Sequence, residues 1–225
     1  VVRQHGIAQN GFDVMSCQFA MHYMFEKKES FYNFIRNIAE CTKLNGYFIS
    51  TCYDGTSIFN MLKNKELGES DDIFINEKKV WSITKKYDST TLNNDESCLG
   101  YEIDVYQDSI NQSITEYLVN FDFFTSTMDK YGFKLVNRED SKKMNLPEGS
   151  GLFSELFTQM EMEIKNDPKK EINYKDALLM KDYEKKISFL NRFFVFQKVS
   201  TRNAEKLTKT LLGQTNEQEE LELVG

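Results

Sequence analysis

The chain has 225 residues, a formal net charge of -7, and 40% hydrophobic residues. This length allows one core of ordinary size, and the acidic balance argues against a protein that holds nucleic acid mainly by neutralising phosphates. We find no apolar run long enough to cross a bilayer and no signal peptide, which argues against a membrane-spanning or secreted protein.

The four cysteines are scattered, with no CxxC pair and no spacing typical of metal ligands, and the chain has only two histidines. This pattern argues against a zinc site and favours a reducing compartment. The sequence begins Val1-Val2-Arg3 rather than with Met. We therefore expect the chain to be a processed product or a piece of a longer protein.

The first part of the chain predicts a strand, a helix and a second strand. Residues 12–19 form the first strand, and apolar residues at helical spacing predict a helix over 29–44. Ser30 is the expected N-cap, and Asn45-Gly46 is the expected end of this helix. Residues 47–52 form the second strand, and the length of the crossover suits a parallel pair.

The rest of the chain predicts an α/β protein that ends in antiparallel strands. In chain order we expect a helix at 56–64, a short strand at 80–83 inside the polar stretch 66–98, paired strands at 101–106 and 114–119, a helix at 121–131, a strand to 136, helices at 151–165 and 174–190, and a closing strand at 192–198. A tail from residue 200 is expected to be helical to Leu212 and then acidic and solvated.

The most specific signal is the segment FDVMSCQFAMHY, which runs from Phe12 to Tyr23. It resembles the strand-to-loop signature F-D-x-x-S-C-Q-F-x-x-H-Y of the messenger-RNA cap guanine-N7 methyltransferases. In that family the loop lies between the methyl donor and the guanine. Without the resemblance, Phe19 and Tyr23 would be read as core aromatics, and His22 as a core histidine with satisfied hydrogen bonds.

The resemblance implies a Rossmann-like fold. The chain would hold the second half of an S-adenosylmethionine-dependent methyltransferase sheet, with parallel strands, closing antiparallel strands and a β-rich insertion. Residues 1–199 would then be the C-terminal portion of the methyltransferase domain, and residues 200–225 a tail or linker. The glycine-rich donor loop of the family is not found in this sequence, and Gly149-Ser150-Gly151 follows no suitable strand.

A second match surrounds Glu116, in the segment TEYLVNF, which is similar to the family's P-E-F-L-V-Y-F segment. A carboxylate can accept two parallel hydrogen bonds from guanine N1–H and N2–H₂, whereas adenine lacks this pair of donors. The alternative is that Glu116 is an ordinary surface residue of an amphipathic strand.

The resemblance assigns two overlapping sets of site residues. Guanine would be positioned by Phe19, His22, Tyr23 and Glu116, and the methyl donor would be contacted by Ser16, Gln18, Phe19 and Tyr23. Guanine N7 carries a lone pair, so no covalent catalyst, general base or metal is expected.

The sequence departs from the family pattern at two places near the expected pocket. Asn191 stands where the family often has a tyrosine just before the closing strand. Tyr53-Asp54-Gly55 replaces a T-P-N-type turn and is expected to border the pocket.

Two main interpretations follow. The chain is the acceptor-side part of an enzyme that transfers a methyl group from S-adenosylmethionine to N7 of the cap guanine, or it is a non-catalytic cap-binding or stimulatory module. A methyltransferase acting on another small acceptor is a weaker third interpretation. Expected partners are the capped 5′ end of RNA and other capping-enzyme domains, or a subunit that supplies the donor-binding half. The expected location is the nucleus or cytoplasm, or a viral factory or virion if the protein is viral.

Overall fold

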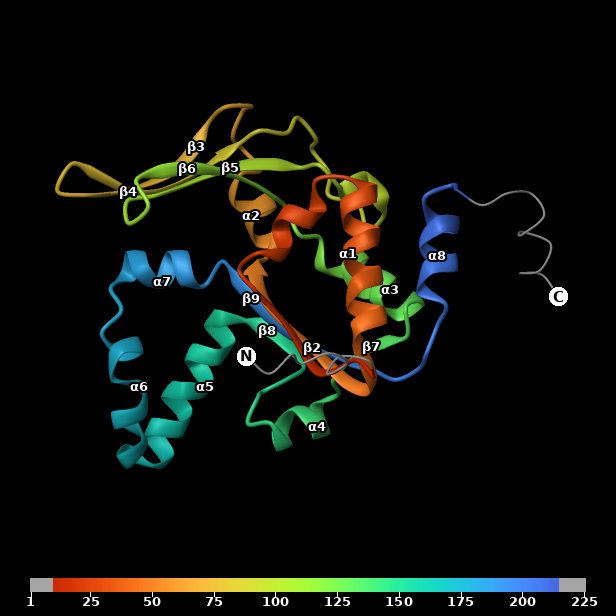
Figure 1. Cartoon of the computed structure of the whole chain (residues 1–225). Coiled ribbons are helices and arrows are strands. Elements are labelled where there is room, and N and C mark those ends of the chain that lie inside the picture. The colour runs from red at the N-terminus through yellow and green to blue at the C-terminus, as the bar shows by residue number, and fades with distance from the viewer. Residues whose placement is uncertain (1–9, 215–225) are drawn as a thin grey trace, which may run out of the picture.

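A five-stranded mixed sheet forms the centre of the molecule in the computed structural model, which describes residues 10–214 (Figure 1). Its strands are β1 (Phe12–Gln18), β2 (Thr42–Tyr53), β7 (Phe133–Leu135), β8 (Ser150–Leu152) and β9 (Asn191–Lys198). The order is β1-β2-β9-β7, and β8 also pairs with β9. The β1 and β2 strands are parallel, while β9 runs antiparallel to β2, β7 and β8.

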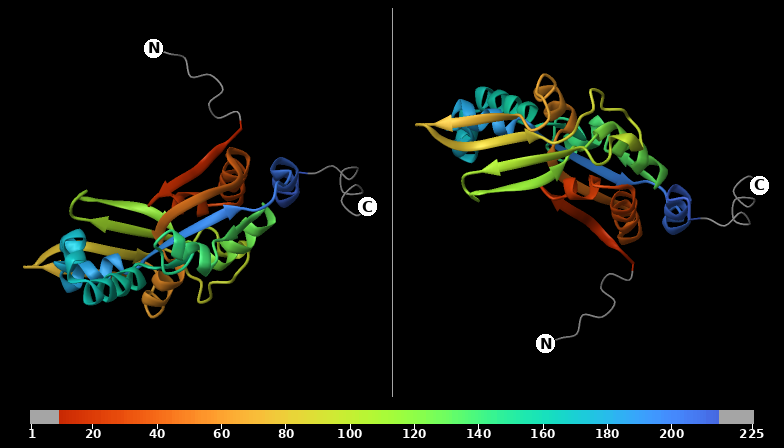
Figure 2. Two further views of the ribbon diagram at one scale, coloured as in Figure 1. Left: turned by 90° about the horizontal axis from the view of Figure 1, so that it is seen from below. Right: turned by 90° about the horizontal axis from the view of Figure 1, so that it is seen from above.

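A second sheet is entirely antiparallel and follows chain order. Its strands are β3 (Ser70–Ile75), β4 (Lys78–Lys85), β5 (Glu102–Gln107) and β6 (Gln112–Tyr117). This sheet is the predicted β-rich insertion. Figures 1 and 2 show that it projects toward the same end of the molecule as helices α5 to α7.

Most helices lie around the mixed sheet, one packs on the antiparallel sheet, and the others form a separate arm. Around the mixed sheet lie the 3₁₀ helix η1 (Met21–Phe25), α1 (Lys28–Cys41), the 3₁₀ helix η2 (Glu96–Cys98), α3 (Phe121–Lys130), α4 (Arg138–Lys143) and α8 (Ala204–Leu211). Helix α2 (Gly55–Met61) packs with the antiparallel sheet, since its Ile58 and Phe59 share a core cluster with Trp81 of β4. The arm comprises α5 (Phe153–Asn166), the 3₁₀ helix η3 (Pro168–Lys170), α6 (Glu171–Leu178) and α7 (Asp182–Ser188). Within residues 10–214, none of the helices has the length and apolar character needed to cross a membrane.

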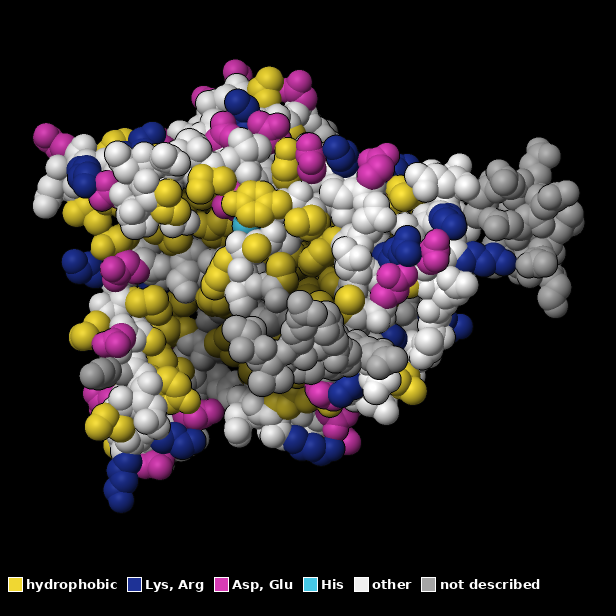
Figure 3. All heavy atoms as spheres, viewed as in Figure 1, with side chains coloured by type: hydrophobic (Ala, Val, Ile, Leu, Met, Phe, Trp, Pro, Cys, Tyr) yellow, Lys and Arg dark blue, Asp and Glu magenta, His cyan; other side chains and the backbone are white. Residues whose placement is uncertain are grey.

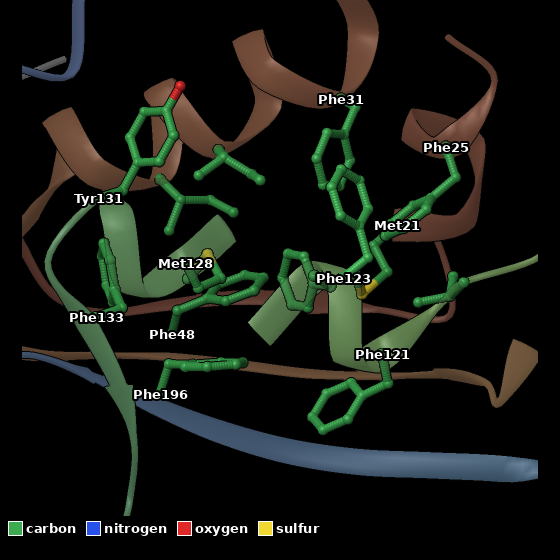
Figure 4. Packing of buried hydrophobic residues seen from close by; sticks show 14 of the residues in the cluster. Met21, Phe25, Phe31, Phe48, Phe121, Phe123, Met128, Tyr131, Phe133 and Phe196 are labelled. Atoms are coloured by element: carbon green, nitrogen blue, oxygen red, sulfur yellow. The ribbon is translucent and has the colours of Figure 1, made fainter. Parts of the chain in front are cut away.

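The main core lies between the mixed sheet and helices α1 and α3, and aromatic rings fill much of it (Figure 4). Phe194 of β9 is 1% exposed and contacts four rings, those of Phe48, Phe121, Phe124 and Phe196. Large aromatic side chains bury much apolar surface, so this cluster fixes α3 against the strands that end at the candidate site.

Helix α8 belongs to the same core. Its first residue, Ala204, is buried in the cluster, and Leu207 and Leu211 pack against it. The Tyr131 and Thr208 hydroxyls are hydrogen-bonded at 2.7 Å. The part of the 200–225 segment up to Leu211 therefore packs on the domain, while the expected acidic end lies outside the described residues.

The parallel strand pair, the closing antiparallel strands and the α/β class are confirmed, but the boundaries of the first helix are not. Helix α1 ends at Cys41, and β2 begins at once. Ser30 is the third helical residue, and its hydroxyl donates to the Lys27 carbonyl at 2.9 Å. Asn45 does take a positive φ of 65°, as expected for an Asn-Gly pair, but it does so where the register of β1 and β2 shifts.

Three further expectations need correction. Strand β3 lies in the stretch expected to hold only one short strand, because pairing with β4 outweighs its polar sequence. The helix expected at 174–190 is two helices, since the chain breaks at Met180-Lys181. The helix expected from 151 starts at Phe153, because β8 pairs with β9 before it.

We expect Phe194→Ala to lower the free energy of unfolding by about 3–5 kcal/mol, because the cavity lies among four rings that cannot all close in. Urea denaturation measures this loss. Phe74→Ala is the matched control, since Phe74 is 57% exposed, and it should cost less than about 1 kcal/mol. Equal losses in the two variants would contradict this account of the core.

Candidate functional site

The first part of the site is the sharp turn that leads from β1 into η1. Phe19 takes a positive φ of 51° and its amide donates to the Thr51 carbonyl at 2.8 Å. This left-handed residue ends the strand and directs the chain into η1. His22 is then buried at 5% exposure, while the Phe19 and Tyr23 side chains remain 54% and 40% exposed.

The second part is Glu116 on β6, which is 8% exposed. The segment after β6 is fastened to the end of β2, because the Gly55 amide donates to the Val119 carbonyl at 3.0 Å. A Cβ at Gly55 would stand 2.3 Å from that carbonyl oxygen, so only glycine allows this approach. The contact holds β6 close to the β2 end of the mixed sheet.

These two parts bring His22 and Glu116 together. His22 Nε2 lies 3.6 Å from Glu116 Oε2, which is beyond hydrogen-bonding distance. Both atoms are buried, and neither has a hydrogen-bond partner. Since an unsatisfied buried polar atom costs free energy, these two atoms mark a candidate ligand-binding site.

Burial also shifts the pKa values of His22 and Glu116. Loss of hydration lowers the pKa of His22 to about 4 and raises the pKa of Glu116 to about 7. The imidazole is therefore neutral at physiological pH, and the carboxyl group titrates near neutrality. A ligand that donates hydrogen bonds to the carboxylate would favour its ionised form.

A cavity of about 380 Å³ opens between the two sheets and the arm, and both groups line it. Its lining residues are Phe19, His22, Tyr23, Tyr53, Gln107, Ile110, Ile114, Glu116, Ile187 and Asn191. All four residues expected at the guanine therefore meet in one cavity, and Tyr53 borders it as expected.

Ser16 and Gln18, expected at the methyl donor, lie elsewhere. The Gln18 amide donates to Ser16 Oγ at 2.9 Å and accepts from Thr51 Oγ1 at 2.7 Å, across the parallel strands. Gln18 lines a separate, mainly apolar hollow of about 400 Å³ on the β1-β2-β9 face. Figure 3 shows apolar side chains gathered along a hollowed face beside the arm. The expected donor set is thus divided, with Phe19 and Tyr23 in the cavity and Ser16 and Gln18 on the strand side.

Four lining residues were not predicted from the sequence, namely Gln107, Ile110, Ile114 and Ile187. Ile114 could have been found, because alternate residues of a strand share a face and Glu116 is two positions away. Gln107 and Ile110 belong to the β5–β6 hairpin, and Ile187 belongs to helix α7. Tertiary packing places these elements at the cavity, and no local sequence pattern marks the three residues as lining it. Among residues 10–214, no group of three or more potential metal ligands stands together.

The sequence matches the family model of the mRNA (guanine-N(7))-methyltransferase domain over residues 3–200. The chain belongs to this family. The Rossmann-like methyltransferase architecture that the resemblance implied is confirmed as well.

Individual relatives agree with the family match. The chain is 30% identical to the "Probable mRNA-capping enzyme" of Acanthamoeba polyphaga mimivirus, and the match covers 86% of this chain and 18% of that protein. It is 31% identical to the mRNA cap guanine-N(7) methyltransferase of Drosophila melanogaster, over 64% of this chain and 32% of that protein. The chain thus spans less than a third of the length of either relative. Among solved structures, the CcbJ methyltransferase from Streptomyces caelestis aligns with a TM-score of 0.44 at 10% identity, covering 86% of this chain and 60% of that one.

The two pKa shifts predict opposite effects of pH on stability. The folded-state pKa of Glu116 exceeds the ordinary value of 4.5, so its contribution to stability is present below pH 4.5 and is lost as the pH rises to about 7. The folded-state pKa of His22 lies below the ordinary 6.5, so its contribution is present above pH 6.5 and is lost as the pH falls to about 4.

We therefore expect Glu116→Gln to lose stability on acidification from pH 6.5 to 4 more steeply than the wild-type protein. His22→Gln should instead lose stability more steeply as the pH rises from 4.5 to 7. Urea denaturation across this range measures both slopes. Parallel pH profiles for the three proteins would contradict the assigned titrations.

Proposed function

We propose that this chain is the acceptor-side part of an S-adenosylmethionine-dependent mRNA cap guanine-N7 methyltransferase. The observation that carries the proposal is the buried, unpartnered pair of His22 Nε2 and Glu116 Oε2 in an aromatic-lined cavity. The family match supports the same reaction. The capped 5′ end of RNA would be the substrate, and its methylation would take place in the nucleus or cytoplasm.

Guanine would supply hydrogen-bond donors to the buried Glu116 carboxylate, whose Oε2 has no partner. The ionised Glu116 carboxylate would accept from guanine N1–H and N2–H₂ in parallel. Adenine has no equivalent pair of donors, so its binding would leave the buried carboxylate unsatisfied. Sites that reject an analogue in this way discriminate more strongly than apolar pockets do.

The chemistry needs positioning rather than proton transfer. Guanine N7 attacks the sulfonium methyl group of S-adenosylmethionine with its own lone pair, so this chain's task is to orient the base and exclude water. Neutral His22, with its lowered pKa, adds no positive charge beside a base that becomes cationic. Aromatic faces from Phe19 and Tyr23 and the Glu116 carboxylate would favour that developing charge.

The donor would approach from the β1 side of Phe19. Ser16 and Gln18 offer polar groups at the carboxyl end of β1, where ligands bind in sheets of this class. The described chain does not contain the family's glycine-rich loop. We therefore propose that the donor-binding half comes from another part of a longer capping protein or from a separate subunit.

Glu116→Gln should lower kcat/KM for methyl transfer to GpppA-capped RNA by about 100-fold or more, because two charge-assisted hydrogen bonds to guanine are lost. Transfer of labelled methyl groups in the presence of the donor-binding half measures the rate. Glu102→Gln, on the neighbouring strand and outside the cavity, is the matched control and should retain the wild-type rate. A near-normal rate in Glu116→Gln would rule out the proposed guanine contact.

Tyr23→Ala should weaken binding of the cap analogue GpppA by about tenfold, because one stacking face of the cavity is removed. Isothermal titration calorimetry with this chain measures the affinity directly. Tyr183→Ala, which removes a tyrosine of the arm outside the cavity, should leave the affinity unchanged. Unchanged affinity in Tyr23→Ala would show that this ring does not contact the base.

A further inference from the structure

The cavity has an aromatic wall that comes from β2 rather than from the β1–η1 turn. Tyr53 is the last residue of β2 and Asn191 is the first residue of β9, and the two are paired directly across the antiparallel strands. Both side chains line the cavity. Directly opposed residues have their Cβ atoms about 4.5–5.5 Å apart. Tyr53 and Asn191 therefore line the same part of the cavity wall.

Asn191 does not provide a flat surface to this wall. It is 7% exposed, and its amide donates to the carbonyls of Ile187 at 3.2 Å and Ser188 at 3.0 Å. These bonds satisfy carbonyl groups at the C-terminal end of α7, so the side chain is engaged in holding the helix. The large planar side chain of this wall is therefore Tyr53.

The Tyr53 ring is fixed from its far end. Trp81 of β4 is 1% exposed, and its Nε1–H donates to the Tyr53 hydroxyl oxygen at 3.2 Å. Trp81 is in turn paired across the strands with Gln107, another lining residue. The ring thus spans from the mixed sheet to the antiparallel sheet.

Hydrogen bonds of Asp54 also fix the backbone next to Tyr53. The Asp54 amide donates to the Leu190 carbonyl at 2.8 Å, and Arg192 Nε donates to Asp54 Oδ2 at 2.6 Å. The Arg192 guanidinium lies 4.6 Å from the centre of the Phe121 ring, so it is anchored on the core. A rigid wall loses little conformational entropy when a ligand binds against it.

We propose that Tyr53 is a guanine-recognition residue that provides the stacking wall on the β2 side of the cavity, in place of an aromatic side chain at Asn191. The inference rests on the proposed function, since it names a contact to the same base. Glu116 would read the edge of the guanine while Tyr53 contacts its face. Phe19 and Tyr23 reach the cavity from the separate β1–η1 segment, so their aromatic surface does not replace this wall.

The test is calorimetric titration of this chain with GpppA, with ApppA as the adenine control. Wild-type protein should bind GpppA in preference to ApppA. Tyr53→Leu, which keeps an apolar side chain but has no π-face, should weaken GpppA binding about tenfold or more. Tyr53→Phe keeps the ring and should bind within about threefold of wild type.

Tyr106→Ala is the control for loss of a tyrosine outside the cavity, and it should bind as the wild type does. Thermal unfolding of each variant establishes that it is folded at the titration temperature. If Tyr53→Leu does not fold, Tyr53→Asn provides the second variant without a ring. Wild-type affinity in either folded variant would overturn the inference and leave the proposed function intact. Failure of the wild-type chain to prefer GpppA would instead overturn the proposed function, and the inference with it.

Discussion

The antiparallel pairing of β2 with β9 is the interaction on which the rest of the molecule depends. It joins residues that lie 138 to 150 positions apart along the chain and sets Phe48 opposite Phe196 in the core. The same register sets Tyr53 opposite Asn191 at the cavity. A slip by one residue would turn Phe194 and Phe196 of β9 out of the core and remove Asn191 from α7. One pairing therefore fixes both the hydrophobic core and one wall of the candidate site.

The site keeps two polar groups in an unfavourable state that the core can support. His22 Nε2 and Glu116 Oε2 lose hydration on folding and have no hydrogen-bond partner in exchange. The aromatic cluster beneath β2 and β9 buries apolar surface, and this burial opposes the cost. Unsatisfied buried groups are expected at sites that bind ligands, where the ligand supplies the missing partners. Under the proposed function, the same feature would make guanine, with two adjacent donors, a better ligand for the cavity than adenine.

Much of the architecture could be predicted because its signals are local. The segment from Phe12 to Tyr23 places a strand and a loop at fixed spacing, and residues 114–116 show strand alternation. Strand β3 could not be predicted, because its sequence, SDDIFI, carries two aspartates and is held in place by pairing with β4. The Asn45-Gly46 pair correctly signals a positive φ, but sequence alone does not distinguish a helix end from an irregular strand. Gln107 and Ile187 reach the cavity from elements whose placement is set by tertiary contacts.

The most direct test of the account is a crystal structure of this chain with GpppA. The account predicts that the guanine lies in the cavity with N1 and N2 within hydrogen-bonding distance of the Glu116 carboxylate. It also predicts that the base lies beside the Tyr53 ring. A guanine bound at another place, with His22 and Glu116 still unpartnered, would contradict the central claim that these two groups await the cap.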